Sequence, residues 1–280
     1  KCYQNTWEYK GYNFISGTDG INIYQDNFKS VSVIDVDLSK SGISFGGVTQ
    51  VDTKYLNSHN GLGYINKRFQ GQLKAYNLQK EKNGSNFNNF KRKFVQDAFG
   101  ENNFLKNGSD YNDIFAVVNG QFFNANKENT TLSFPVKSNG TILNSYVDND
   151  KKKRTVIIDK MGVIKIMEGY NESYLNDKNN KEVLVGINPS EDFSKNRSVG
   201  RTYMGLIGDD RVVFFIAQSK TQHEMKKIAL DYGIEGQNLV MLDGGPSSQF
   251  AYFDIFEVGG GINSFYGGWE VPHSIMIFKK

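Results

Sequence analysis

The chain has 280 residues, of which 38% are hydrophobic and 14% aromatic, and this length suits one large domain whose core is rich in aromatic rings. Thirty-three Lys and Arg against 30 Asp and Glu leave a net charge of +3, which argues against a nucleic-acid-binding protein, because such proteins usually carry a strong basic excess. The longest dense apolar run covers only 212–217, far short of the roughly 20 residues that a membrane span needs.

Cysteine and histidine are too few for several kinds of site. Cys2 is the one cysteine, so an intrachain disulfide and a cysteine metal cluster are both excluded. His59, His223 and His273 have no partner at metal-ligand spacing, and we therefore predict no catalytic zinc. The chain begins Lys-Cys without an apolar leader, which we interpret as a mature form.

Short apolar or alternating runs predict strands along most of the chain. Two pairs of runs flank turn-forming residues at 159–162 and 208–210, a pattern typical of hairpins. The run 239–242 is wholly apolar, as expected for a strand buried on both faces. In chain order the predicted strands are 31–37, 114–118, 155–158, 163–167, 202–207, 212–216, 239–242 and 275–278.

Two segments have helical spacing. In 87–98 the apolar side chains fall on one helical face, and Gly100 follows as a stop. In 222–232 the pattern is sharper, because Thr221 and Glu224 form a capping box at its start. We predict a helix in each segment.

The order of these elements predicts the fold class. A strand at 212–216, a helix at 222–232 and a strand at 239–242 indicate a βαβ-like crossover with parallel strands. Together with the hairpins, this crossover favours an α+β fold, with a mixed, largely antiparallel sheet or sheets and flanking helices.

We expect residues 1–280 to form a single domain. Residues 1–110 show few strong elements and are poorly defined, whereas residues 110–280 carry the motifs. The polar stretch 170–198 is interpreted as an excursion from this domain rather than a boundary.

The most informative motif follows the predicted strand 239–242. Asp243 comes directly after it, followed by Gly244 and Gly245, and then by Pro246, Ser247 and Ser248. Two glycines allow positive φ and the close approach of a ligand, and their N–H groups can form an anion-binding nest. A tight turn that Asp243 caps is the structural alternative.

A second motif follows the predicted strand 114–118. Asn119, Gln121 and Asn124 surround Phe122 and Phe123. Amides and rings together suit a sugar, since amides pair with hydroxyls and rings stack on the apolar face. Alternatively, the two rings belong to the core and Asn119 to a turn.

A third segment reaches the same edge if the strand 202–207 runs antiparallel to the strands before the two motifs. Arg201 and Thr202 lie at its start, and the planar guanidinium of Arg201 suits a phosphate or carboxylate. His273 enters the last strand and is a candidate acid, base or phosphate donor. Three distant segments would then converge on one site.

Paired carboxylates for ordinary glycoside hydrolysis are not identified by spacing. Asp243 is the best single candidate. The possible partners, which spacing does not rank, are Glu168, Asp254, Glu257 and Glu270.

The segments 119–123, 201–202 and 242–248, in this order and with a capped helix before the last, resemble the phosphodiester glycosidase family. The resemblance covers roughly 110–280, and the Val271-Pro272-His273 segment before the final strand also fits it. Gln121 stands where the family usually has Gly, and Pro246 where it often has a third Gly.

The resemblance implies a hydrolase that cleaves a sugar-1-phosphodiester and leaves a phosphomonoester. It implies catalytic roles for Asp243, Arg201, Asn119 and His273, with Asp243 stabilising the cationic glycosyl centre or orienting water. It implies that the substrate is bound by Thr202, Gly244, Gly245, Ser247, Ser248, Gln121, Phe122, Phe123 and Asn124.

No cofactor and no resident metal are expected, and the partner is a sugar phosphate or polysaccharide. Bacterial members of the family suggest a secreted or cell-envelope location. Two alternatives stay open: a non-catalytic glycan-binding module, which the aromatic and Asn-rich composition suggests, and a metal-dependent phosphoesterase that uses Ca²⁺ or Mg²⁺.

Overall fold

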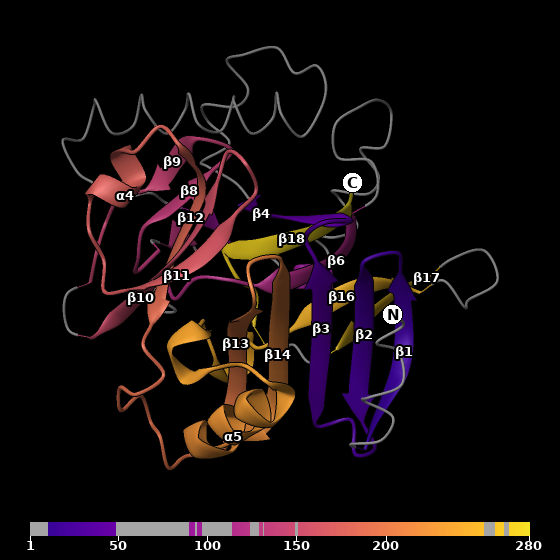
Figure 1. Ribbon diagram of the computed structural model, residues 1–280. Helices are drawn as coiled ribbons and strands as arrows, with labels where there is room; N and C mark the ends of the chain where they lie inside the picture. Colours follow the sequence, from indigo (N-terminus) through magenta and orange to yellow (C-terminus); the bar gives the residue numbers. More distant parts are fainter. Residues whose placement is uncertain are drawn as a thin grey trace.

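A computed structural model (Figure 1) describes most of the chain. The described residues are 11–48, 90–92, 94–96, 114–123, 129–130, 132–148, 151–254, 261–265 and 269–280.

A large twisted sheet runs through the molecule, with α5 against one of its faces and a smaller sheet against the other (Figure 1). Its main path has the order β1-β2-β3-β14-β13-β15-β12-β10-β11, and β8 joins it through β12 and pairs in turn with β9. Its strands are β1 (Tyr12–Thr18), β2 (Ile21–Asp26), β3 (Val31–Asp37), β8 (Val136–Ser138), β9 (Thr141–Asn144), β10 (Lys153–Asp159), β11 (Ile164–Glu168), β12 (Asn180–Ile187), β13 (Val199–Ile207), β14 (Arg211–Lys220) and β15 (Leu239–Met241).

The smaller sheet has the order β17-β16-β6-β18-β4, and β5 pairs with β7 in a separate ribbon. These strands are β4 (Ser41–Val48), β5 (Phe90–Lys91), β6 (Ile114–Asn119), β7 (Asn129–Thr130), β16 (Phe250–Asp254), β17 (Gly261–Phe265) and β18 (His273–Lys279). The helices that the structure describes in full are α4 (Ser173–Asn176) and α5 (Gln222–Tyr232), with short 3-10 turns η3 (Gly236–Asn238) and η4 (Gly245–Ser247).

The alternation of side chains along the strands divides the apolar residues between two cores. On β14 and β13, Phe214 and Met204 point into a cluster that also contains Phe45 and Phe250 of the smaller sheet, so this core lies between the sheets. The next residues, such as Phe215, point to the opposite face and pack with α5 through Met225, Ala229 and Tyr232. Burial of each large apolar side chain contributes about 1.5–3 kcal/mol to stability.

The capping box predicted for 222–232 is present at the start of α5. The Thr221 hydroxyl accepts from the Glu224 N–H, and the Glu224 carboxylate accepts from the Thr221 N–H. The helix ends at Gly233, whose φ of 100° is left-handed. At its last turn Tyr232 donates a hydrogen bond to the buried Asp35 carboxylate, which also pairs with Arg211. These contacts hold α5 against β3 and β14.

The predicted strands and both hairpins are confirmed. The run 31–37 is β3, and the hairpins are β10–β11 and β13–β14. The apolar run at 239–242 becomes β15, whose side chains enter both cores. The final run lies within β18.

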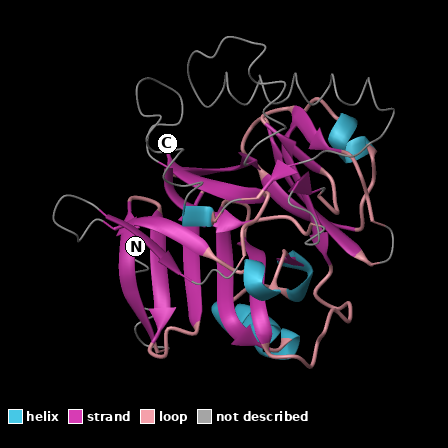
Figure 2. Cartoon of the chain, turned by 180° about the vertical axis from the view of Figure 1, so that it is seen from behind, coloured by secondary structure: helices cyan, strands magenta, loops and turns pink. Residues whose placement is uncertain are grey.

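The predicted α+β class with flanking helices is wrong, because the described structure is mostly antiparallel β sheet (Figure 2). Each strand pairing in the described part is antiparallel. β14 and β15 do run in the same direction on either side of α5, but β13 lies between them and pairs with both. The crossover therefore spans one strand instead of joining two neighbours.

Two other predictions change. Half of the segment 87–98, where a helix was expected, lies outside the described residues; in the rest, Phe90–Lys91 is the strand β5 and residues 95–96 are helical. The stretch 170–198 is not simply an excursion, because its residues 180–187 form β12, which pairs with β10, β15 and β8.

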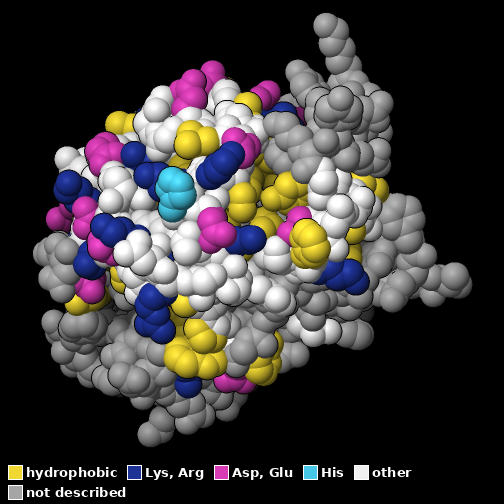
Figure 3. Space-filling model, turned by 90° about the horizontal axis from the view of Figure 1, so that it is seen from below, with side chains coloured by type: hydrophobic (Ala, Val, Ile, Leu, Met, Phe, Trp, Pro, Cys, Tyr) yellow, Lys and Arg dark blue, Asp and Glu magenta, His cyan; other side chains and the backbone are white. Residues whose placement is uncertain are grey.

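Charged side chains of both signs are mixed over the face seen from below (Figure 3), in keeping with the small net charge of +3. No described helix is long and apolar enough to cross a membrane.

One buried carboxyl joins the two sheets. Glu182 of β12 is 2% exposed, and it accepts backbone N–H bonds from Phe45 of β4 and from Asn139, both at 2.8 Å. Burial raises its pKa to about 7, and the two N–H donors and the Ser138 hydroxyl offset only part of this effect. The smaller sheet is thereby tied to the larger one through a polar contact inside the core.

We predict that Glu182→Gln lowers the free energy of unfolding by about 1–3 kcal/mol, because an amide NH₂ would face one of the two N–H donors. The folded pKa of about 7 lies above the unfolded value of 4.5. The stability that proton uptake gives is therefore present at low pH and is lost as pH rises through 7. In urea unfolding, the difference in the free energy of unfolding between wild type and variant should shrink from about pH 5 to about pH 8.

The exposed Glu172→Gln is the matched control and should change neither the free energy of unfolding nor its dependence on pH. A gap that widens with pH would contradict the raised pKa of Glu182.

Candidate active site

The carboxamide of Asn119, at the end of β6, is fully buried and bonds to three other segments. Its Nδ2 donates to the Asp243 carbonyl at 2.8 Å. Its Oδ1 accepts from Thr202 Oγ1 at 2.8 Å and from the Gln249 N–H at 3.1 Å. The Thr202 hydroxyl also lies 3.2 Å from Ser248 Oγ. The three segments predicted to converge therefore meet at this residue.

Glycines allow the strand ends to approach one another. A Cβ on Gly120 would lie 2.0 Å from His273 Nδ1, and a Cβ on Gly200 would lie 2.0 Å from the Gly245 carbonyl oxygen. Both positions exclude any side chain. Gly245 differs, since its φ of +63° is left-handed and a Cβ there would meet no heavy atom within 4 Å. The space beside Gly245 is open to a ligand.

The segment after Asn119 bonds both to Asp243, just after the end of β15, and to β12. The Asp243 N–H donates to the Gly120 carbonyl at 3.1 Å. Gln121 Nε2 donates to the Val185 carbonyl of β12 at 2.5 Å and contacts the Pro135 carbonyl at 3.4 Å. Gln121 is 1% exposed, and its Oε1 has no hydrogen-bond partner among the described residues.

Asp243 has the most perturbed environment of the predicted site residues. Its Oδ1 accepts from the Gly244 N–H at 2.9 Å, whereas Oδ2 is buried without a hydrogen-bond partner of normal geometry in the described structure. Burial raises the carboxyl pKa to about 7, and the Ser247 hydroxyl and the Gly244 N–H lower it only in part. A carboxyl poised near neutral pH suits a general acid or base.

The structure uses both ring nitrogens of His273 for backbone contacts. Nδ1 accepts from the Gln121 N–H at 3.0 Å, so Nε2 carries the proton and donates to the Phe45 carbonyl at 2.8 Å. Complete burial lowers the pKa of the ring to about 4. His273 thus positions the 119–121 segment as a neutral imidazole, and neither nitrogen is turned toward a ligand.

Arg201 is also engaged with the protein itself. Its guanidinium is 3% exposed and donates to four backbone carbonyls instead of a carboxylate. Burial lowers its pKa. A direct contact with phosphate, as expected from the sequence, would require these bonds to break. The acceptors are the carbonyls of Phe193, Ser194, Arg197 and Lys220.

The aromatic pair after Gln121 divides between two environments. Phe122 is 8% exposed, and its ring makes edge contacts with Phe134 at 5.7 Å and Phe193 at 5.4 Å between centroids. Phe123 is partly buried against the core and forms a bridge with Leu132. Asn124 lies outside the described residues.

Carboxylates other than Asp243 are not placed at this site by the described structure. Glu168 bonds to Arg154 and Asn188, and Glu270 is exposed. The side chains of Asp254 and Glu257 lie outside the described part. In the described ranges no three His, Cys, Asp or Glu side chains gather as a metal site would require.

Gln249 was missed by the sequence analysis. Its carbonyl accepts from the Asn119 N–H, and its own N–H donates to Asn119 Oδ1. Its side chain accepts from the Val95 N–H and donates to the Trp269 carbonyl. A glutamine after two serines carries no recognisable motif, so the sequence offered no signal for it.

Comparison with known proteins agrees with this arrangement. A family model described as phosphodiester glycosidase matches residues 112–278, which is more than half of the chain. The chain belongs to the phosphodiester glycosidase family. No curated protein sequence matches it.

Among solved structures, the zebrafish N-acetylglucosamine-1-phosphodiester alpha-N-acetylglucosaminidase catalytic domain, auto-inhibited by its pro-peptide, is similar in fold. The TM-score is 0.50 at 13% identity, over 96% of this chain and 87% of that one. A hypothetical protein from Synechocystis gives a TM-score of 0.46 at 9% identity, over 96% of this chain and 64% of that one.

We predict that Asn119→Asp lowers the free energy of unfolding by about 2–4 kcal/mol, because a buried carboxylate oxygen would replace the donor to the Asp243 carbonyl. Urea unfolding at neutral pH measures this change. The exposed Asn179→Asp is the matched control and should stay close to wild type. Equal stability of the two variants would show that the Asn119 carboxamide does not hold the strand ends.

Proposed function

We propose that the protein hydrolyses the glycosidic bond of a sugar-1-phosphodiester, releasing the sugar and leaving a phosphomonoester. The observation that carries this proposal is the Asp243 carboxyl, which follows β15 next to the Gly244–Gly245 backbone and whose Oδ2 is buried without a hydrogen-bond partner of normal geometry in the described structure. Family membership and the name of the zebrafish enzyme support the reaction class. A cell-surface polysaccharide or phosphosugar polymer is the substrate that we propose.

In the proposed reaction, water attacks the anomeric carbon while the bond from that carbon to the phosphate oxygen breaks. The Asp243 carboxylate takes the proton from the water and stabilises the positive charge that develops at the sugar. The bonding electrons leave with the phosphomonoester. Because a phosphomonoester is a good leaving group, no strong general acid is required.

The remaining predicted residues divide into two groups in this proposal. The loop at Gly244–Gly245 borders the space for the phosphate, and the Ser247 hydroxyl supports the ionised Asp243. Asn119, Thr202 and Ser248 form a buried hydrogen-bonded cluster that fixes the loop in place. They act on the substrate through the position of Asp243.

We predict that Asp243→Asn lowers kcat by about 100-fold or more, because the amide cannot take a proton. The assay uses the methyl ester of N-acetyl-α-D-glucosamine 1-phosphate and measures free sugar. For the wild type, kcat/KM should rise with pH through an apparent pKa of about 7, since the carboxylate is the active form and its pKa is raised to that value. The variant should lack this rise.

The exposed Asp209→Asn, which removes the same charge from the β13–β14 turn, is the control and should retain wild-type turnover. A wild-type rate that falls with rising pH through 7 would assign Asp243 the acid role instead of the base role. Binding of the ester without any turnover by the wild type would favour a glycan-binding module.

A further inference from the structure

The loop 188–198 spans the end of β15, where the proposed catalytic carboxyl lies. The loop begins after Ile187, which pairs with the last residue of β15. It leads to Gly200, which packs directly on the Gly244–Gly245 backbone. Both ends of the loop therefore border the short segment that contains Asp243.

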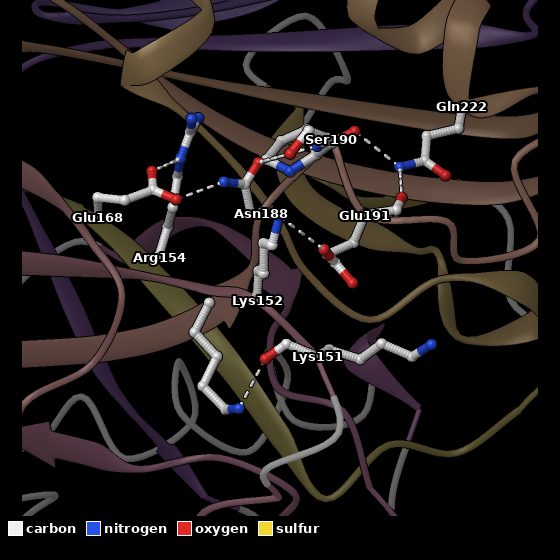
Figure 4. Close-up of polar contacts among 10 residues, drawn as sticks. Lys151, Lys152, Arg154, Glu168, Asn188, Ser190, Glu191 and Gln222 are labelled. Atoms are coloured by element: carbon white, nitrogen blue, oxygen red, sulfur yellow. Dashed lines mark hydrogen bonds and ion pairs between the residues drawn. The ribbon is translucent and has the colours of Figure 1, made fainter.

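Buried and half-buried amides hold the first half of this loop (Figure 4). Asn188 Nδ2 donates to Glu168 at 2.6 Å, and its Oδ1 accepts from the Ser190 N–H at 2.9 Å. From the first turn of α5, Gln222 Nε2 donates to the carbonyls of Pro189 and Glu191 at 2.8 and 2.5 Å. Gln222 is 3% exposed, so these contacts are protected from water.

Arg201 holds the second half. Its NH1 donates to the Phe193 carbonyl at 2.9 Å, and its NH2 donates to the carbonyls of Ser194 and Arg197 at 2.7 and 3.2 Å. A buried guanidinium with three carbonyls of one loop fixes the course of the main chain there.

Residues 192–198 of this loop are exposed, and Phe193 is the one large hydrophobic side chain among them. Phe193 is 37% exposed, although it is a large hydrophobic residue in a loop held on both sides. One edge rests on Phe122 at a ring-plane angle of 74°. Phe122 is two residues beyond Gly120, whose carbonyl binds the Asp243 N–H. The ring of Phe193 thus contacts the segment 120–122, whose first residue is hydrogen-bonded to Asp243.

We propose that Phe193 forms a wall of the sugar-binding site and stacks on the apolar face of a pyranose ring of the substrate. This inference rests on the function proposed above. Arg201 and Gln222 are positioning residues, which act on the sugar through the loop and not by touching it. A preformed aromatic surface binds a sugar without an added cost of ordering the loop.

The test compares Phe193→Ala, Phe193→Tyr and Arg201→Lys in hydrolysis of the methyl ester of N-acetyl-α-D-glucosamine 1-phosphate. Phe193→Ala should raise KM by about tenfold and leave kcat within about twofold, because stacking is lost equally in the enzyme–substrate complex and in the transition state. Phe193→Tyr should restore KM. Arg201→Lys should raise KM, because lysine cannot span the three carbonyls. Leu230→Ala, at a 53% exposed position on α5, is the control that should match wild type.

Binding gives a second readout that does not depend on turnover. Phe193→Trp places a fluorophore in the wall, and N-acetyl-α-D-glucosamine 1-phosphate should change its emission relative to the parent protein. A tenfold weaker affinity of Phe193→Ala for this ligand in calorimetry should accompany the change in KM.

The outcomes separate this inference from the proposed function. An active wild type whose KM is unchanged in folded Phe193→Ala would overturn the wall and leave the proposed function standing. An inactive wild type whose Phe193→Trp form still responds to the sugar phosphate would overturn hydrolysis and support the wall. Loss of both turnover and response would overturn both.

Discussion

The hydrogen bonds of one buried carboxamide determine where the active-site segments lie. Asn119 ends β6 of the smaller sheet, yet its partners are Thr202 of the larger sheet, Asp243 just after β15 of that sheet, and Gln249 before β16. Because the group has no contact with water, each bond lost would leave an unsatisfied polar atom in the core. The same closeness explains why Gly120 and Gly200 have no room for a side chain.

The backbone of Phe45 extends this polar contact across the sheet interface. Its N–H donates to Glu182 of the larger sheet, and its carbonyl accepts from His273, which in turn binds the Gln121 N–H. Burial shifts the two titratable groups in opposite directions, raising the pKa of Glu182 and lowering that of His273. Both side chains are thereby neutral over part of the acid range, so neither places an unpaired charge in the interior there.

Local patterns predicted elements better than they predicted their arrangement. Alternation found β3 and both hairpins, and the capping box found α5, because these signals lie within a few residues of one another. The sequence did not predict β4, because three of its residues are glycines, which pack closely against neighbours such as Ser274 and interrupt the apolar pattern. It did not predict β12 either, because polar residues flank that strand. The fold class failed because β13, which precedes β14 in the chain, lies between β14 and β15, and pairing between distant strands leaves no local trace.

In the site, too, residues marked by a local pattern could be predicted, and contacts between distant segments could not. Asp243 and Asn119 could be identified because each ends an apolar strand, whereas the part played by Arg201 depends on the course of a loop that its own sequence does not reveal. Beyond Asn188, Arg201 and Gln222 hold that loop through its main chain: they bond to carbonyls and an N–H of residues 189–197. These bonds do not depend on the side chains of the residues whose main chain they hold. Substitutions can accumulate at these positions during evolution without loss of the framework, so a new ligand preference can arise by exchange of a single outward-facing residue.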